Sequence, residues 1–85
     1  MYYVYMLKSI NCEDEDFYLG FTEDVWKREE EHNQGLNKSI KHCQWMLVYF
    51  EAYVSKSYAM IREKELKRNR RMKQLLVERV RKSLK

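Results

Sequence analysis

The segment that most restricts the fold is residues 2–8, which is apolar or aromatic at both of its alternating sets of positions. Successive side chains of a strand point to opposite faces. Large apolar groups would here lie on both faces, namely Tyr3, Tyr5 and Leu7 on one and Tyr2, Val4 and Met6 on the other. Such a pattern is typical of a strand buried on both sides. We therefore expect residues 2–8 to form a central strand.

A second strand is predicted over residues 17–21, after an acidic loop at 13–16. Its apolar positions alternate with Tyr18 and Gly20, which share the other face. The connection to the first strand is short, and short connections join antiparallel neighbours. The two segments are therefore expected to form an antiparallel hairpin.

Capping residues and periodicity define the rest of the chain. Thr22 can cap a helix that ends near Asn33, with Gly35 just beyond it. Asn69 interrupts the last helical stretch, and Ser55 or Ser57 can cap the part before it. The remaining expected elements are a polar loop over 36–44, a strand over 45–53, and helices over 58–68 and 71–83. The order β-β-α-β-α-α, in one domain over residues 1–85, predicts an α+β fold.

Composition favours a compact globule, because 45% of the residues are hydrophobic, 14% are aromatic and proline is absent. Cys12 and Cys43 stand far apart without a further Cys or His at zinc-ligand spacing, which favours two free thiols in a reducing compartment. The N-terminus lacks the pattern of a signal peptide. No apolar stretch approaches the ~18 residues of a membrane span. We therefore expect a soluble, cytoplasmic protein with no membrane contact.

The net charge of +4 is divided unevenly along the chain. Residues 1–61 carry 6 Lys and Arg against 10 Asp and Glu, whereas residues 62–85 carry 11 against 3, a net of +8. A basic C-terminal third is expected of a protein that binds phosphates. The alternative is a charged helix that is merely solvated, and charge alone does not decide between the two.

Polar residues fall on the predicted inward faces of two helices: Glu63 on one, and Arg28 or Glu29 with His32 on the other. Glu63 lies on the apolar stripe of its helix, where a carboxylate must be paired, neutralised or bound to a cation. A salt bridge to a nearby Lys or Arg is the alternative to a metal. Arg28 and His32 are one helical turn apart, so they can converge on one anion. Here the alternative is an exposed helix with Lys–Glu pairs such as Lys27 with Glu31.

Gly20 has no side chain and shares a face with Tyr18, which would leave room for a substrate or a backbone segment to approach closely beside a phenol. Tyr3 and Tyr5 lie together on the neighbouring strand. An aromatic face of a sheet is usually core, so these tyrosines are candidates for a site only in combination with the charged residues.

In combination, these segments resemble the GIY-YIG nuclease family, and within it the small single-domain bacterial members. The segments that carry the resemblance are, in chain order, Tyr3-Val4-Tyr5, Tyr18-Leu19-Gly20, Thr22 to Arg28 with Glu31-His32-Asn33, Trp45 to Tyr49, and Ala59 to Lys67. They span nearly the whole chain. The first half-motif lacks the family's glycine, and Gln44 stands where a proline is expected. These departures remove no proposed catalytic residue and concern substrate preference instead.

The resemblance implies a three-stranded antiparallel sheet flanked by helices, and a metal-dependent endonuclease that hydrolyses DNA. Tyr5 would activate or orient the attacking water, and Tyr18 would assist it. Arg28 would bind the scissile phosphate, with His32 as a further proton-transfer or phosphate-orienting group. Glu63 would hold one divalent ion, Mg²⁺ or Mn²⁺. A phenol with a pKa of ~10 is a poor base, so Arg28, Lys8 or the metal would have to favour the phenolate.

The predicted partner is nucleic acid, DNA rather than RNA. Its backbone would be bound by basic residues, namely Lys8, Lys67, Arg68, Arg70, Arg71 and Lys73. A protein partner or a homodimer is expected to supply targeting. Two alternatives stay open: a nucleic-acid-binding module without catalysis, and an assembly domain that retains the site residues mainly for structure.

Overall fold

The computed structural model describes residues 1–10, 12, 14–34 and 44–84. Three strands and three helices follow one another as β1 (Tyr2–Ile10), β2 (Phe17–Thr22), α1 (Val25–Asn33), β3 (Gln44–Tyr53), α2 (Lys56–Arg68) and α3 (Arg70–Ser83). The predicted α+β class and the order β-β-α-β-α-α are confirmed. Gly35 and residues 36–43 of the predicted loop lie outside the described residues, and Gln44 already belongs to β3.

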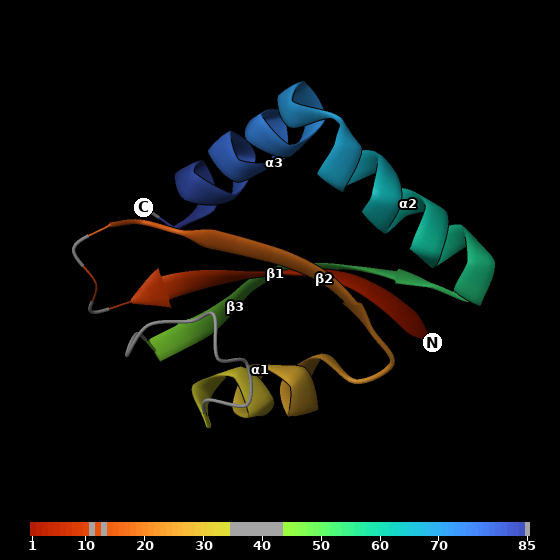
Figure 1. The fold of residues 1–85 in the computed structure, drawn as a ribbon, viewed down its shortest axis with the longest axis horizontal. Coiled ribbons are helices and arrows are strands. Elements are labelled where there is room, and N and C mark those ends of the chain that lie inside the picture. Colours follow the sequence, from red (N-terminus) through yellow and green to blue (C-terminus); the bar gives the residue numbers. More distant parts are fainter. Residues whose placement is uncertain (11, 13, 35–43, 85) are drawn as a thin grey trace.

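The strands form one antiparallel sheet in the order β2-β1-β3 (Figure 1), so the predicted central position of the first strand is confirmed. Tyr5 pairs with Gly20 on β2 and with Phe50 on β3. The β1–β3 register shifts near Val48, which has no partner on β1. Helix α1 covers one face of the sheet, and α2 and α3 cover the other (Figure 1).

The two faces of β1 belong to two separate cores. The core under α2 and α3 buries the side chains of Val4, Met6, Phe17, Leu19, Ala59, Leu66, Leu76 and Val80. The core under α1 buries those of Tyr5, Leu7, Val25 and Trp45, with Tyr3, Tyr18 and Leu47 packed against it. Burial of such side chains contributes roughly 1.5–3 kcal/mol each. A strand that is apolar on both faces thus forms the inner wall of both cores.

The helices begin at different residues from those expected. The Asp24 side chain accepts from Lys27 N at 3.1 Å and caps α1, so the prediction of Thr22 as the cap is wrong. Thr22 instead bonds the backbone of Asp24 in a turn that sets the cap in place. Ser55 caps α2 through Tyr58 N, and Asn69 ends α2 and caps α3. Short polar side chains that bond nearby backbone favour such positions.

Side chains of α1 hold part of the free edge of β3. Asn33 donates to the Trp45 carbonyl at 2.9 Å and accepts from Trp45 N at 2.6 Å. Glu29 accepts from Leu47 N at 2.6 Å. An edge strand leaves every second residue's backbone groups unpaired. These three bonds replace a neighbouring strand, and they fix α1 to the sheet.

Cys12 is disulfide-bonded, so the expectation of a free thiol at this position is wrong. Cys43 lies outside the described residues. Among the described residues, no helix is long and apolar enough to cross a membrane.

Candidate functional site

Tyr5 lies at the centre of the predicted site, and its position depends on Gly20. The two residues are register partners on neighbouring strands. A methyl group on Gly20 would come within 2.6 Å of Tyr5 Cζ and 2.8 Å of Tyr5 Cε1. No side chain fits at that distance, so the glycine is what allows the phenol to lie across β2. The interpretation that Gly20 leaves room for a substrate is corrected, because the Tyr5 ring fills that room.

The Tyr5 side chain is 1% exposed, and its burial raises the pKa of the phenol well above its ordinary value. Tyr18 and the charge of Glu63 raise this pKa further, and only the charge of Arg28 lowers it. Lys8 is not among the groups that act on Tyr5. Strand alternation places Lys8 on the opposite face, where its charge acts on Glu15. Tyr5 is therefore a neutral phenol at neutral pH.

Four of the predicted residues come together from four different elements. Tyr5 on β1 bonds Tyr18 on β2, and it lies within range of the charges of Arg28 on α1 and Glu63 on α2. The two helices cover opposite faces of the sheet (Figure 1), and both act on the phenol that crosses the edge strand β2. We call Tyr5, Tyr18, Arg28 and Glu63 the Tyr5 cluster.

Tyr18 connects this cluster to His32 through ring contacts. The Tyr18 and His32 rings meet edge to face with centroids 4.6 Å apart, and Trp45 lies 6.4 Å from Tyr18 and 6.3 Å from His32. His32 is 5% exposed, and burial followed by the charge of Arg28 lowers its pKa. Its Nδ1 has no hydrogen-bond partner among the described residues. His32 is thus a neutral imidazole on α1 that packs against the Tyr18 ring.

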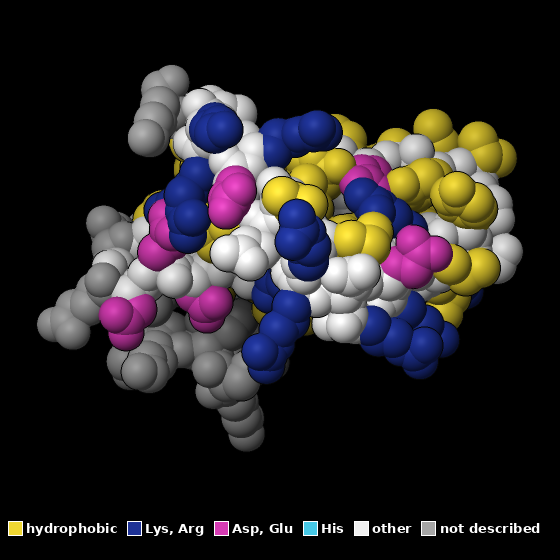
Figure 2. Space-filling model, turned by 90° about the horizontal axis from the view of Figure 1, so that it is seen from above, with side chains coloured by type: hydrophobic (Ala, Val, Ile, Leu, Met, Phe, Trp, Pro, Cys, Tyr) yellow, Lys and Arg dark blue, Asp and Glu magenta, His cyan; other side chains and the backbone are white. Residues whose placement is uncertain are grey.

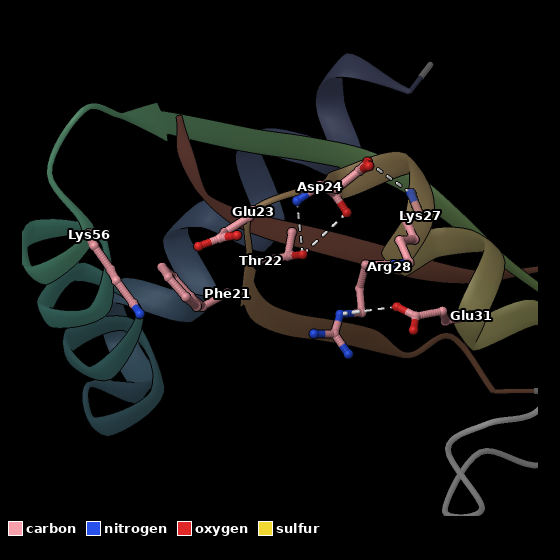
Figure 3. Close-up of a pocket in the computed structure, with 8 residues that line it drawn as sticks. All are labelled: Phe21, Thr22, Glu23, Asp24, Lys27, Arg28, Glu31 and Lys56. Atoms are coloured by element: carbon pink, nitrogen blue, oxygen red, sulfur yellow. Dashed lines mark hydrogen bonds and ion pairs between the residues drawn. The ribbon is translucent and has the colours of Figure 1, made fainter.

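Arg28 is the most accessible member of the Tyr5 cluster, with 44% of its side chain exposed. Its Nε lies 3.8 Å from Glu31 Oε1, which is a long ion pair. The guanidinium lines a pocket of about 440 Å³ between α1 and the start of α2 (Figure 3). An exposed guanidinium with a weak partner can still take an oxyanion with two parallel bonds. Arg28 is therefore accessible from this pocket, and its role in binding a phosphate stays a prediction.

Glu63 is 19% exposed and pairs with Lys67 one turn later, at 3.2 Å between Oε2 and Nζ. The salt-bridge alternative for this carboxylate is thus present, at one of its two oxygens. Among the described residues, no group of three His, Cys, Asp or Glu side chains could hold a metal. Mg²⁺ needs only one or two carboxylates, because it keeps several waters and takes substrate phosphates as ligands. The donor set fits Mg²⁺ held by Glu63 alone, and that role stays a prediction.

The basic residues predicted to bind nucleic acid lie apart from Arg28. Most belong to the two helices that cover the other face of the sheet, where basic side chains alternate with acidic and apolar ones (Figure 2). These are Lys67, Arg68, Arg70, Arg71 and Lys73. Lys8 faces the same side from β1. The structure therefore separates most of the predicted basic surface from the α1 side of the sheet.

A second group of charged and phenolic residues was missed by sequence reasoning. Glu51 on β3 accepts bonds from Arg62 Nε and Nη2, both at 2.9 Å, and from the hydroxyls of Tyr49 and Tyr53. We call these four residues the Glu51 cluster. The sequence contains a signal for this group, because Tyr49, Glu51 and Tyr53 are two positions apart and therefore lie on one face of a strand. A carboxylate between two tyrosines on a buried face requires a cation opposite it.

Comparison with known proteins agrees with this arrangement. The family described as GIY-YIG catalytic domain matches residues 1–75. A UPF0213 protein of Haloquadratum walsbyi is 39% identical over 80 residues, which covers 91% of this chain and 86% of that one. UPF0213 proteins of Clostridium perfringens and Staphylococcus aureus are 39% and 38% identical and cover 85% and 87% of this chain, and 80% and 89% of their own lengths. No solved structure gives a significant match.

The match reaches every element from β1 into α3, and it includes all members of the Tyr5 cluster. The relatives have almost the same length, so the likeness is not confined to one motif. This chain therefore belongs to the GIY-YIG family, together with the small UPF0213 proteins.

Proposed function

We propose that this protein is a metal-dependent endonuclease that hydrolyses phosphodiester bonds of DNA through the Tyr5 cluster. The observation that carries the proposal is the convergence of two phenols, a guanidinium and a carboxylate from four elements. Family membership supports the same reading. In the reaction, a water oxygen forms a bond to phosphorus while the bond from phosphorus to the leaving sugar oxygen breaks. One proton of the water passes through solvent to the leaving oxygen, and negative charge increases on the phosphate oxygens in the transition state.

Arg28 stabilises that charge in this mechanism. Its guanidinium is exposed on the pocket side, and within the part of the chain that the structure describes its one ion pair is the long contact with Glu31. A cation beside a developing oxyanion lowers the barrier by several kcal/mol, because it stabilises the charge that increases during the reaction. When a phosphate replaces Glu31 as the partner of Arg28, the guanidinium can stabilise the charge on that phosphate.

Glu63 would hold the divalent cation, Mg²⁺ or Mn²⁺, which would supply Lewis-acid stabilisation of the phosphate when bound. The oxygen of Glu63 that does not face Lys67 is the one available for this role. Glu63 also lies close enough to Tyr5 for its charge to act on the phenol. The cation site and the phenol therefore belong to one reaction centre.

The tyrosines orient water or phosphate in this mechanism rather than serve as a free base. The raised pKa of the Tyr5 phenol keeps its proton in place at neutral pH, so Tyr5 acts as a hydrogen-bonding group. Tyr18 bonds Tyr5 and is fixed by its contact with the His32 ring. With its lowered pKa, His32 is uncharged and positions Tyr18.

The test is cleavage of labelled duplex, single-stranded, flapped and branched DNA while Mg²⁺ or Mn²⁺ is titrated. Glu63→Gln keeps the size of the side chain and removes its charge, and Glu65→Gln makes the same change at an exposed position of the same helix. We expect products with wild type and Glu65→Gln, and none with Glu63→Gln. Equal cleavage by Glu63→Gln and wild type would contradict the proposal.

A second function, DNA binding without hydrolysis, is favoured by one observation. The residues from 62 onward carry a net charge of +8 and are mostly exposed on α2 and α3. This function predicts salt-sensitive binding that survives metal chelation and Glu63→Gln, with no product in any condition. RNA in place of DNA in the same assay separates the two nucleic acids.

The expected surroundings of the protein follow from its proposed substrate. A DNA nuclease acts where DNA is found, which agrees with the cytoplasmic location predicted from sequence. The disulfide at Cys12 argues in the other direction, because structural disulfides are rare in reducing compartments. Targeting would come from a protein partner or from a homodimer, and measurement of the mass in solution with and without DNA tests the latter.

A further inference from the structure

The basic residues predicted on α2 and α3, from Lys67 to Lys73, do not account for how DNA would reach Arg28. They lie over one face of the sheet, whereas Arg28 projects from α1 on the other. A phosphodiester bound at Arg28 belongs to a chain whose neighbouring phosphates must also lie against the protein. The positive groups beside Arg28 are therefore the ones to identify.

The pocket beside Arg28 is formed by the end of β2, the first turns of α1 and the first residue of α2. It has a volume of about 440 Å³ and is lined by Phe21, Thr22, Glu23, Asp24, Lys27, Arg28, Glu31 and Lys56. Figure 3 shows Arg28 and Lys56 extending toward the space between the two helices, from opposite sides. Three cations thus line the pocket: Lys27 and Arg28 come from α1, and Lys56 comes from α2, which is far from α1 in the sequence.

Lys56 is also aligned with Glu63. The two residues are seven positions apart on α2, which places them on one stripe of the helix, about 10 Å apart along its axis. Lys56 therefore has two spatial relations to the Tyr5 cluster: one across the pocket to Arg28, and one along α2 to Glu63. No other lysine or arginine of the described residues lines this pocket from α2.

The carboxylates of the pocket are mostly engaged with other groups. Asp24 accepts from the α1 backbone, and Glu31 faces Arg28. Glu23 lines the pocket as well, yet no carboxylate of the described residues lies within ion-pair distance of Lys56. The ammonium of Lys56 is thus exposed and available for an anion.

We infer that Lys56 binds the DNA phosphate next to the phosphate bound at Arg28. The DNA strand would then cross this pocket, and it would not follow the basic residues from Lys67 to Lys73 on α2 and α3. The inference rests on the proposed function for its substrate and names the path of that substrate. Lys56 is a binding residue in this view, which supplies a charge contact and takes no part in the bond that breaks.

The test compares Lys56→Ala with Lys82→Ala, which makes the same charge change in the last turn of α3, far from the pocket (Figure 1). The probe is a short labelled DNA duplex, with binding measured over a range of NaCl concentrations in the presence of a metal chelator. Loss of one phosphate contact lowers the slope of log K against log salt by about 0.9 and the affinity about fivefold at physiological salt. We expect this change for Lys56→Ala, wild-type behaviour for Lys82→Ala, and recovery in Lys56→Arg.

Cleavage separates this inference from the proposed function. If wild type cleaves DNA, Lys56→Ala should raise KM about fivefold and leave kcat nearly unchanged. Equal slopes and affinities for the two alanine variants would overturn the Lys56 contact and leave the nuclease intact. A selective loss in Lys56→Ala without cleavage by any variant would support the contact and contradict the nuclease. Absence of binding by wild type overturns both.

Discussion

The Tyr5 cluster and the Glu51 cluster are built from the same four groups, two phenols, one guanidinium and one carboxylate. In the Glu51 cluster, Arg62 bonds the carboxylate through two nitrogens and both tyrosines donate to it. In the Tyr5 cluster, the guanidinium and the carboxylate are not paired with each other, and each has only one partner on its own helix. We call the Glu51 cluster closed, because its guanidinium and carboxylate are paired with each other. We call the Tyr5 cluster open, because its guanidinium and carboxylate are not.

The difference shows which arrangement can take a ligand. A closed network satisfies its own charges and fixes β3 to α2, so a ligand would have to break several bonds to enter. An open one leaves a cation and an anion with capacity for a phosphate and a metal. Residue type alone did not separate the two clusters; the pairing of the charges does.

The largest expected effect falls on the open cluster. Arg28→Ala should lower kcat/KM for DNA cleavage by about 100- to 1000-fold, because it removes a fixed charge beside the developing oxyanion. Its melting temperature should stay within a few degrees of wild type, since the side chain is half exposed and weakly paired. Arg62→Ala is the matched variant in the closed cluster. A fall in activity of equal size in both variants would remove the distinction.

Gly20→Ala should disturb the open cluster through packing. The added methyl group meets the Tyr5 ring at distances that require the ring or the strand to move. We expect a loss of about 1–3 kcal/mol in the free energy of unfolding, together with reduced cleavage, measured by urea titration and initial rates. The double variant Gly20→Ala with Tyr5→Ala should recover part of the stability. No recovery would show that the cost comes from the β2 backbone instead.

Glu51→Gln should destabilise the protein and leave the chemistry intact. The amide cannot neutralise Arg62, and it accepts poorly from two hydroxyls and a guanidinium at once. A loss of about 2 kcal/mol is expected from urea titration, with kcat unchanged under conditions where the variant is folded. Reduced kcat in a fully folded variant would indicate that the closed cluster also contributes to the reaction.

The smallest expected effect is the pH dependence of the stability that the closed cluster contributes. Burial alone would raise the pKa of Glu51, but bonds from Arg62 and the two tyrosines outweigh it and lower the pKa from 4.5 to about 2. Since the folded state depresses this pKa, its stabilisation is complete above pH 4.5 and is lost as the pH falls toward 2. The urea concentration at the midpoint of unfolding should therefore decrease as the pH is lowered from 4.5 toward 2. The decrease with pH should be less steep in Glu51→Gln. Equal slopes would contradict the assignment.

Local patterns predicted the elements and the members of the open cluster. The double-faced run before Lys8 and the alternation around Tyr18 were enough for the hairpin, and family resemblance assigned the roles. Three-dimensional contacts could not be predicted in the same way. That the Tyr5 ring occupies the space above Gly20 depends on the β1–β2 register, and the separation of the α3 cations from Arg28 depends on which face each helix covers. Neither contact can be predicted from the spacing of residues along one helix or strand.

The bonds from Glu29 and Asn33 to the edge of β3 make α1 and that strand edge one unit. Glu29 and Asn33 fasten the helix, and their sequence neighbours Arg28 and His32 face the reaction centre. Attachment and chemistry are thus assigned to adjacent positions of one nine-residue helix. A designer could exchange the outward positions of α1 for others without moving the arginine, and could transplant the helix only together with the strand edge that receives it.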